Sequence, residues 1–599
     1  MEGMERVLIV VGAILLIATV LEIAPRLRIP PALALVVIGA VIGIMPFVPA
    51  IRIDPEWILV GVLPPLLYSA AAQMPTMEFR RDFSAISALS VVLVLVSALL
   101  LGAFFWAVVP GIGFAAGVAL GAIVSPTDAV ATGMAKKLGV PSRVTAVLEG
   151  ESLLNDASAL VLLRAAVAAM AATISFGGVA LNFAFSAVGA VIIGGIVGYV
   201  ILRVRSRVSD PAVNTAISIT VPYLAYLPAE ELHASGLVAA VTAGLVTGAG
   251  GVRYLNSRHR ISDTQNWRMI EMLAEGGVFL LMGLELWGLI VDVHNDHDGV
   301  LRALWIGLAA LAVAVVIRAL YMVPMVRALE KRRRRGEELR PILEGYTVTP
   351  SATLPGTEPT GWARRLSRWR WRFRFNRRKE PELNLSEVSL QTAGRINARV
   401  TRALADIDYY DEAPLGPKEG AIIVWAGLRG VVTVAAAQTL PTDTPERSLL
   451  VLTAFIVAAA SLLVQGGTLP LLIKQLKLPD VRANQRSERL RLRAVMDQTV
   501  RTVMADSDKV KEVPWLRARI EQANREAEDS EDGVGTSSTY GLSNTERAQV
   551  RAVRREIINA QRGMLLRMRR EGEYSSEALS RVLNQLDAEE ISLDLQGGG

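Results

Sequence analysis

Several polar and acidic side chains stand at helical spacing inside one apolar stretch of this 599-residue sequence. Ser152 and Asp156 are four residues apart, so in a helix they share one face, and Glu151 and Asn155 share the next. The surrounding stretch, about 145–170, is long and apolar enough to cross a bilayer as a helix. A charge near the bilayer centre costs at least about 2.5–3.5 kcal/mol, so such a residue usually faces a cavity, a partner or a transported ion. The pattern therefore indicates an ion pathway or, as the plainer alternative, a structural polar cluster within a helix bundle.

The same residue types suit a cation that competes with a proton. Na⁺ is a hard ion that prefers oxygen ligands, which Asp156, Ser152 and Thr127 can supply together with exposed carbonyl groups. Burial disfavours a bare carboxylate, so a proton and a cation can replace one another on it. Histidine is the other common proton carrier, but all four histidines fall in or beside expected loops: His233, His259, His294 and His297. We therefore expect the carboxylate of Asp156 to carry the proton.

Two further apolar stretches contain helix-breaking residues at membrane depth. In the first, Pro126 removes a backbone donor and leaves unpaired groups that are tolerated only where they line a cavity or contact protein. It lies in the motif Ser125-Pro126-Thr127-Asp128. The second stretch holds an arginine between glycines, Gly427-Leu428-Arg429-Gly430. An early and a late broken helix together indicate an inverted repeat with an ion site between its halves.

These residues must be positioned by a bundle of membrane-spanning helices. Hydrophobic residues form 52% of the sequence, the mean hydropathy is +0.38, and long apolar runs recur over most of its length. Because cysteine is absent, disulfides and thiol chemistry are excluded. We expect an all-α polytopic membrane protein with about thirteen transmembrane helices, inverted repeats, two broken crossing helices and a helical cytosolic tail. The expected spans lie near 6–25, 30–47, 57–73, 83–109, 112–134, 145–170, 183–204, 212–228, 234–248, 267–291, 301–326, 421–440 and 448–476.

Basic residues gather in alternate loops, which orients the chain. By the positive-inside rule, loops such as those holding Arg80 and Lys136 are cytoplasmic. An odd number of spans then places the N-terminus outside and the C-terminus inside, in the plasma membrane. The expected parts are a transmembrane core over 1–328, a basic cytoplasmic insertion over 329–417, the rest of the core over 418–480 and a cytosolic helical regulatory tail over 481–599.

The insertion and the tail carry no catalytic motif. Aromatic and arginine residues alternate over 369–379, which suits either stacking on single-stranded nucleic acid or contact with anionic lipid headgroups. The headgroups are favoured because the segment is tethered beside a bilayer, so no nucleic-acid partner is expected. The tail shows a capping box at 543–546 and charged helices, and we interpret it as a regulatory or assembly module. We also expect a homodimer and no cofactor besides the transported Na⁺ and H⁺.

The motifs at 125–128, 149–156 and 427–430 resemble those of the monovalent cation/proton antiporters of the first type, a family of prokaryotic antiporters and animal exchangers. The resemblance extends to 63–67, 279–284 and Arg318, and covers roughly 7–327 and 418–478. It implies that Asp156 binds cation and proton in turn, that Ser152 and Thr127 add oxygens, and that Asn155 marks electroneutral members. It also implies structural roles: Asp128 and Arg429 compensate the broken helix ends, and Glu151 pairs with Arg318.

The sequence departs from that family at three places. Tyr68 and Ser69 stand where many prokaryotic members carry an acid, so one expected cation ligand is absent. Ala129 replaces a proline that commonly follows the Thr-Asp pair, and the long basic insertion is not a feature of the core family.

Three other acids lie within the spans, and two of them remain open to two interpretations. Glu275 is either an additional titrating group or a partner for Arg164 or a helix end. Glu285 is expected towards the outer end, where it would reach headgroups. Glu149 is either a residue of the cytoplasmic funnel or a structural partner.

The function expected is electroneutral exchange of Na⁺, or of Li⁺ or K⁺, for H⁺. A K⁺-preferring exporter is the first alternative, because of the missing acid. A membrane sensor or channel is a second, although a channel needs a lined pore with ring-like charges. An integral membrane enzyme is not expected, since the spans offer neither metal ligands nor a nucleophile with a base.

Overall fold

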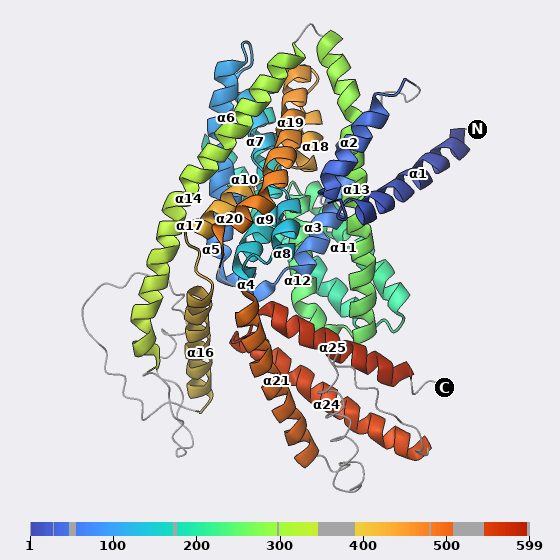
Figure 1. Cartoon of the computed structure of the whole chain (residues 1–599), viewed down its shortest axis with the longest axis vertical. Coiled ribbons are helices and arrows are strands. Elements are labelled where there is room, and N and C mark those ends of the chain that lie inside the picture. The colour runs from blue at the N-terminus through green and yellow to red at the C-terminus, as the bar shows by residue number, and fades with distance from the viewer. Residues whose placement is uncertain are drawn as a thin grey trace. The chain divides into compact units, whose positions relative to one another are not determined.

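The computed structural model describes residues 2–27, 29–46, 55–171, 176–295, 299–344, 390–478, 481–506 and 544–595. Every regular element within these ranges is helical, which confirms the expected all-α class (Figure 1). The elements are α1 (Glu2–Ile23), α2 (Pro31–Gly43), η1 (Trp57–Val62), α3 (Leu63–Gln73), α4 (Thr76–Arg81), α5 (Phe83–Ser87), η2 (Ala88–Leu93), α6 (Val94–Val108), α7 (Phe114–Val124), α8 (Val130–Lys137), α9 (Ser142–Ala171), α10 (Phe176–Arg205), α11 (Pro211–Glu231), α12 (Gly236–Tyr254), α13 (Ser257–Asn295), α14 (Val300–Glu344), α16 (Leu390–Glu412), α17 (Pro417–Trp425), α18 (Val431–Gln438), α19 (Arg447–Ser461), η4 (Leu462–Gly466), α20 (Gly467–Leu476), α21 (Val481–Asp506), α24 (Asn544–Glu571) and α25 (Ser576–Leu595).

Seven of the described helices are long and apolar enough to cross a membrane. Four shorter apolar helices add to them, over Val7–Ile23, Pro31–Gly43, Trp57–Gln73 and Phe114–Val124. The broken helices fall short of a full span because each half is brief: α7 has 11 residues, α8 has 8, α17 has 9 and α18 has 8. The count of thirteen stays a prediction.

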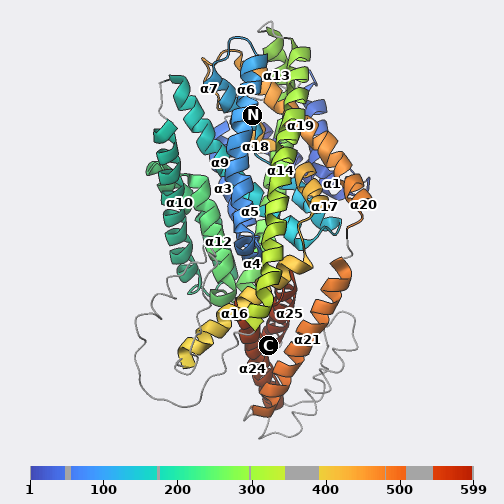
Figure 2. The ribbon, with the colours of Figure 1, turned by 90° about the vertical axis from the view of Figure 1, so that its left-hand side faces the viewer.

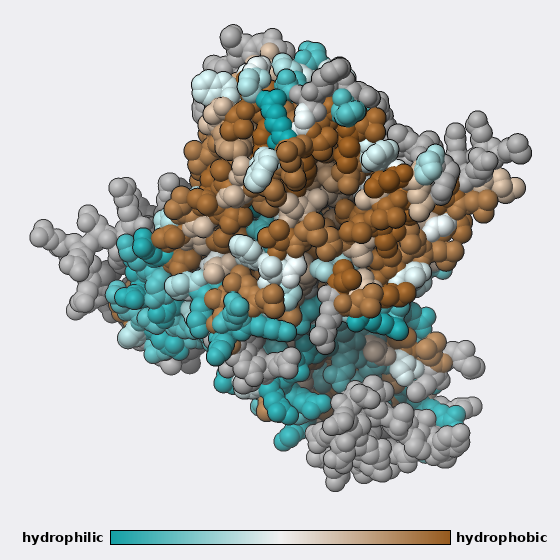
Figure 3. Space-filling model, turned by 45° about the horizontal axis from the view of Figure 1, so that its top comes forward, coloured by the Kyte–Doolittle hydropathy of each residue, from teal (hydrophilic) through white to brown (hydrophobic). Residues whose placement is uncertain are grey.

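The surface of the bundle is apolar, as contact with lipid requires. Large hydrophobic side chains are exposed along several spans, including Trp106, Ile196 and Leu320, and apolar residues cover much of the face shown in Figure 3. Since an aqueous surface rarely holds so large a continuous apolar area, this face is consistent with a bilayer environment.

Small residues allow several helices to approach closely. α2 packs against α13, where a side chain on Gly39 or Gly283 would collide with the backbone of the opposite helix. Such small-residue contacts are the usual means of helix association within membranes. α10 packs beside α12 in the same manner, with Gly194 against Ala239 (Figure 2).

The chain divides into two compact units. The first comprises residues 1–330, 415–569 and 574–599, and it contains the apolar bundle and the tail helices. The second comprises residues 331–414 and 570–573. Inside the second unit, Arg340 pairs with Asp408 at 3.0 Å and Arg333 with Asp411 at 3.3 Å. The alternating aromatic and arginine segment at 369–379, the linker at 528–538 and Ser543 of the capping box lie outside the described residues.

Three tail helices, α21, α24 and α25, share a small apolar core with Met77 of α4. Leu492, Ile558 and Leu583 are among its buried members, one from each tail helix. The helices lie together beyond the ends of α4 and α13 in both ribbon views (Figures 1 and 2). The tail is therefore packed onto one end of the bundle within the first unit.

Candidate ion-binding site at the crossing of two broken helices

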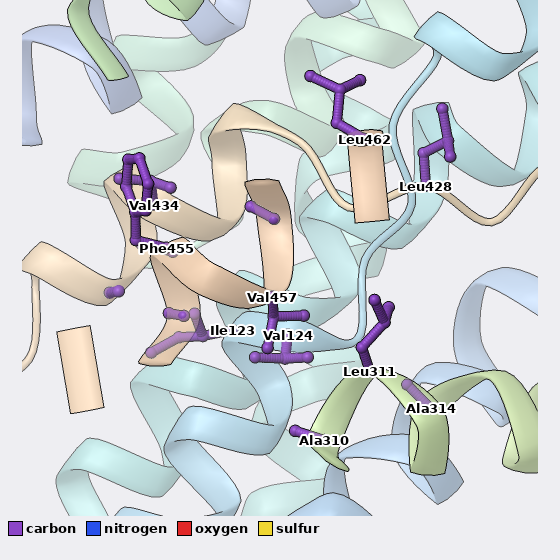
Figure 4. Packing of buried hydrophobic residues seen from close by; sticks show 14 of the residues in the cluster. Ile123, Val124, Ala310, Leu311, Ala314, Leu428, Val434, Phe455, Val457 and Leu462 are labelled. Carbon is purple, nitrogen blue, oxygen red and sulfur yellow. The ribbon is translucent and has the colours of Figure 1, made fainter. Parts of the chain in front are cut away.

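Two interrupted helices meet through their main chains. The first interruption separates α7 from α8 at residues 125–129, and the second separates α17 from α18 at residues 426–430. The backbone amide of Asp128 donates a hydrogen bond to the carbonyl of Leu428, with an N···O distance of 2.7 Å. Around this contact, side chains from α7, α14, α18 and α19 form a continuous apolar core, including Ile123, Leu311 and Phe455 (Figure 4).

At each break, the partial charge of a helix end is opposed by a charged side chain from the other break. Arg429, which is 2% exposed, donates from Nε to the carbonyl of Val124 at the end of α7, at 3.1 Å. The Asp128 carboxylate lies against Gly430, which precedes α18, and a side chain on Gly430 would overlap it. A cation at a helix C-terminus and an anion at a helix N-terminus both oppose the helix dipole. The sequence resemblance implied these two roles, and the geometry places both side chains where they can fulfil them.

The unbroken helix α9 is tied to the first break by Asn155 and Thr127. Asn155 Nδ2 donates to the Thr127 carbonyl at 3.2 Å and to its Oγ1 at 2.8 Å. Thr127 Oγ1 in turn donates to Glu151 Oε1 at 3.3 Å. Asn155 Oδ1 is buried and has no hydrogen-bond partner among the described residues. The Thr127 carbonyl is thus in contact with the Asn155 side chain. Asn155 directly precedes Asp156 on α9.

The carboxylate of Asp156 is buried and has no basic partner among the described residues. Ser152, one turn earlier on α9, is equally buried, at 7% exposure each. The negative charge of Asp128 acts on Asp156 and repels it. An uncompensated buried carboxylate beside a second acid needs a counter-ion, and a cation or a proton can serve.

Glu151 lies on the Asn155 face of α9, and its charge is compensated by Arg318. Arg318 of α14 donates through both terminal nitrogens to the Glu151 carboxylate, at 2.8 Å for Nη2, and from Nε to the carbonyl of Ile423 at 3.0 Å. Both side chains are at most 2% exposed. This pair therefore links α9, α14 and α17 beside the crossing and leaves no charge for a transported ion.

The remaining intramembrane acids have specific surroundings. Glu149 pairs with Lys136. Arg164 pairs with Glu230 at 2.9 Å, so the structure does not support its expected alternative partner, Glu275. Glu285 does not extend towards headgroups, because it is 5% exposed and accepts a hydrogen bond from Gln438 at 2.6 Å.

Sequence reasoning missed one acid near the site. Glu271 of α13 accepts hydrogen bonds from Ser69 and Gln73 of α3. Its spacing of four residues from Glu275 was the available signal, because it places both acids on one helix face.

Interrupted helices that cross at an uncompensated carboxylate in an apolar bundle define a secondary membrane transporter. The family described as sodium/hydrogen exchanger, transmembrane, matches residues 12–345, which is more than half of the sequence. This protein belongs to that family.

Similarity to known members extends over nearly the whole chain. An uncharacterized Na⁺/H⁺ exchanger of Mycobacterium tuberculosis is 26% identical over 597 residues, covering 98% of this chain and 96% of the relative. The Na⁺/H⁺ antiporter ApNhaP of Aphanothece halophytica is 26% identical over 533 residues, covering 88% and 84%. The sodium proton antiporter MjNhaP1 of Methanocaldococcus jannaschii shares the fold, with a TM-score of 0.53 at 17% identity over 80% of this chain and 99% of that chain.

Proposed function

We propose that this exchanger trades one Na⁺ for one H⁺ at Asp156, which presents the two ions alternately to the two sides of the membrane. The observation that carries the proposal is that the buried carboxylate of Asp156 has no basic partner among the described residues, since the two arginines at the crossing serve other groups. Arg318 is held by Glu151, and Arg429 by the end of α7. Asp156 therefore keeps its charge available for a transported ion.

The ligands proposed for Na⁺ are the carboxylate of Asp156, the hydroxyl of Ser152 and an oxygen of Thr127. They are hard oxygen donors, as Na⁺ requires. Asp128 contributes its charge to the site in addition to its role at the helix end. Loading either Na⁺ or H⁺ relieves the repulsion between Asp128 and Asp156, so the two ions exclude one another.

The exchange is proposed to be electroneutral because α9 offers one acid and an amide at the crossing. Asn155, the neighbour of Asp156, is engaged with Thr127 and carries no charge. One cation displacing one proton leaves the loaded site with the same charge in both directions of transport.

Proteoliposomes under an imposed pH gradient test this function. Wild-type protein should give cation-dependent proton flux, and Asp156→Asn should give none while remaining folded, because the change removes the charge at nearly constant volume. Ser158→Ala is a matched control, since within the described part of the chain its hydroxyl bonds only the Leu154 carbonyl of the same helix, at 3.0 Å. Flux at the wild-type rate in Asp156→Asn vesicles would refute the proposal.

A K⁺-preferring exchanger is the second candidate. It is favoured by the absence of an acid at Ser69, which removes one expected ligand from α3. Comparing Na⁺, Li⁺ and K⁺ in the same vesicles decides between the two candidates.

The protein is a multi-pass membrane protein, and we propose that it lies in the plasma membrane with its N-terminus outside. The tail is then cytosolic and, we propose, regulatory. The first residue of α25 is bound to α4, since the amide of Ser576 donates a hydrogen bond to the Glu78 carboxylate at 2.8 Å. In the middle of α25, Asp587, 1% exposed, accepts hydrogen bonds from Ser257 at 3.0 Å and from Arg260 at 2.9 Å. A homodimer and lipid contacts of the basic insertion remain predictions.

A further inference from the structure

One face of α13 carries two carboxylates and points towards the crossing. Glu271, Glu275 and Val278 are spaced by four and three residues, so they share that face. Val278 is buried against Ile58 of η1 and Ala435 of α18, the half-helix that follows the second break. The stripe therefore faces protein at the centre of the bundle, where an acid requires an explanation.

Glu271 is held in place by α3. Ser69 Oγ donates to its carboxylate, and Gln73 Nε2 donates to the same oxygen at 2.8 Å. Gln73 also donates to Ser69 Oγ at 3.1 Å, which fixes the orientation of all three side chains. Both donors are neutral, and Glu271 has no ion pair among the described residues. The charge of Arg268 also acts on Glu271, but the two side chains form no salt bridge within the described ranges, so the carboxylate is positioned by hydrogen bonds alone.

A cavity of about 380 Å³ lies beside these two donors. Ser69 and Gln73 line it, as do Arg260 near the start of α13 and Asn584 of the tail. Arg260 is occupied by Asp587, and Asp263 of the cavity lining pairs through Oδ2 with Arg205 at 3.0 Å, while its Oδ1 has no hydrogen-bond partner among the described residues. The cavity therefore connects the end of the bundle that bears the basic loops with the place where Glu271 is held.

Beyond Glu271 the acids continue to the site. Glu275, one turn further along α13, is exposed, and the charges of Glu271 and Asp128 both act on it. The negative charge of Asp128 in turn acts on the carboxyl group of Asp156. Ala129, next to Asp128 in the first break, is also exposed, whereas Asp156 itself is buried.

We propose that Glu271 is the cytoplasmic-side carboxylate that attracts the cation and passes it by Glu275 to Asp156. This inference rests on the proposed exchange at Asp156. It also accounts for Ser69: the acid absent from α3 is supplied from α13, across the contact that Ser69 and Gln73 make. Glu271 is then a determinant of cation affinity on one face of the membrane.

Everted vesicles, which expose the cytoplasmic face, test the role of Glu271. Glu271→Gln keeps the hydrogen-bonding shape and removes the charge, so the half-saturating Na⁺ concentration should rise about five- to tenfold, as expected for one lost charge attraction in a partly solvated site. The maximal rate should change by less than twofold. Asp292→Asn, which removes an acid near the other end of α13, should leave both values unchanged.

The double variant Ser69→Asp/Glu271→Gln decides between a cation-attracting and a structural role of Glu271. It returns a carboxylate to the same contact from the opposite helix, so it should restore the Na⁺ affinity to within about twofold of wild type. A structural role of Glu271 alone predicts no such rescue. In vesicles of the opposite orientation, Glu271→Gln should have wild-type affinity for Na⁺ on the exposed face.

The outcomes separate this inference from the function on which it rests. If Asp156→Asn is inactive while Glu271→Gln has wild-type affinity on both faces, the role of Glu271 is wrong and the exchange stands. If Glu271→Gln loses affinity equally on both faces, or the double variant is not rescued, the residue stabilises the bundle and does not gather cations. Exchange in Asp156→Asn would overturn both.

Discussion

Arg318 holds both carboxylate oxygens of Glu151 at the centre of the bundle, and each side chain is nearly inaccessible to solvent. The two residues are far apart in the sequence, so their pairing joins α9 to α14 next to the ion site without belonging to it. The pair therefore belongs to the supporting framework of the bundle and not to the residues that handle ions.

Replacing Arg318 with alanine should lower stability more than it changes ion selectivity. The substitution leaves Glu151 buried and unpaired, at an expected loss of about 3–5 kcal/mol. Thermal unfolding in detergent measures the effect, with Arg164→Ala as the control because that arginine is 62% exposed in its pair with Glu230. The double change of Glu151 and Arg318 to leucine should recover part of the loss, whereas Arg318→Ala melting like wild type would show that the pair does not support the bundle.

Gly430→Ala should abolish exchange while the protein still inserts. A β-carbon at this position overlaps the Asp128 carboxylate, so the anion must leave the start of α18. Gly133→Ala in α8 is the matched control, since an added β-carbon there meets nothing within 4 Å. Proton flux in proteoliposomes measures both variants, and equal activity in the two would contradict the proposed role of Asp128 at the helix end.

Exchange should not respond to membrane voltage. Moving one net elementary charge would couple the cycle to about 2.3 kcal/mol per 100 mV, which one-for-one exchange avoids. A K⁺ diffusion potential set with valinomycin, with Na⁺ as the exchanged ion, provides the measurement. A flux whose direction follows the sign of the potential would make Glu275 the first candidate for an additional proton carrier.

Deleting residues 484–599 should preserve exchange and alter its rate or pH dependence. All proposed site residues precede Leu478, while the tail supplies packing and ion pairs to α4 and α13. Flux against pH in correctly inserted truncated protein is the measurement. Complete loss of flux would argue against a purely regulatory tail.

Glu590 of the tail should strengthen docking of α25 throughout the neutral range. Burial opposes its ionisation, but hydrogen bonds from Arg562 and Ser257 and the charges of Arg562 and Arg260 outweigh it, so the pKa of Glu590 lies below its ordinary value of 4.5. A carboxyl group with a lowered pKa stabilises the docked state above its ordinary pKa and loses that contribution as the pH falls through the lowered value.

Glu590→Gln should therefore increase hydrogen exchange of α25 about equally between pH 6 and 8. Glu577→Gln, which removes an exposed i,i+4 pair with Arg581 and leaves an amide oxygen to accept from Gln485, should have no effect. An effect of Glu590→Gln that appears only at one end of this pH range would contradict the lowered pKa.

Local patterns predicted the interruptions, and long-range contacts escaped prediction. Pro126 and the glycines around Arg429 mark the breaks because they act on the backbone of their own helix. In the structure each break separates two short half-helices. The spacing of apolar residues alone would have predicted one continuous span in each place. Partners such as Val124 for Arg429, or Glu230 for Arg164, depend on how helices distant in the sequence pack, and no spacing rule encodes that.

The same limit explains Glu271 and the tail. The absence of an acid at Ser69 was visible in the sequence, but its replacement from α13 required the geometry of α3 beside α13. The tail was expected as helices, yet its attachment through Glu78 and Asp587 depends on residues several hundred positions away.

The hydrogen bond between Asp128 and Leu428 also has a consequence for biosynthesis. Leu428 is translated about 300 residues after Asp128, which corresponds to tens of seconds at about 5–20 residues per second. Until then the first interrupted helix is in the membrane without Arg429 to cover the end of α7. The nascent chain therefore holds an unfinished polar break for about half of its synthesis, and the crossing is incomplete until the second broken helix has inserted.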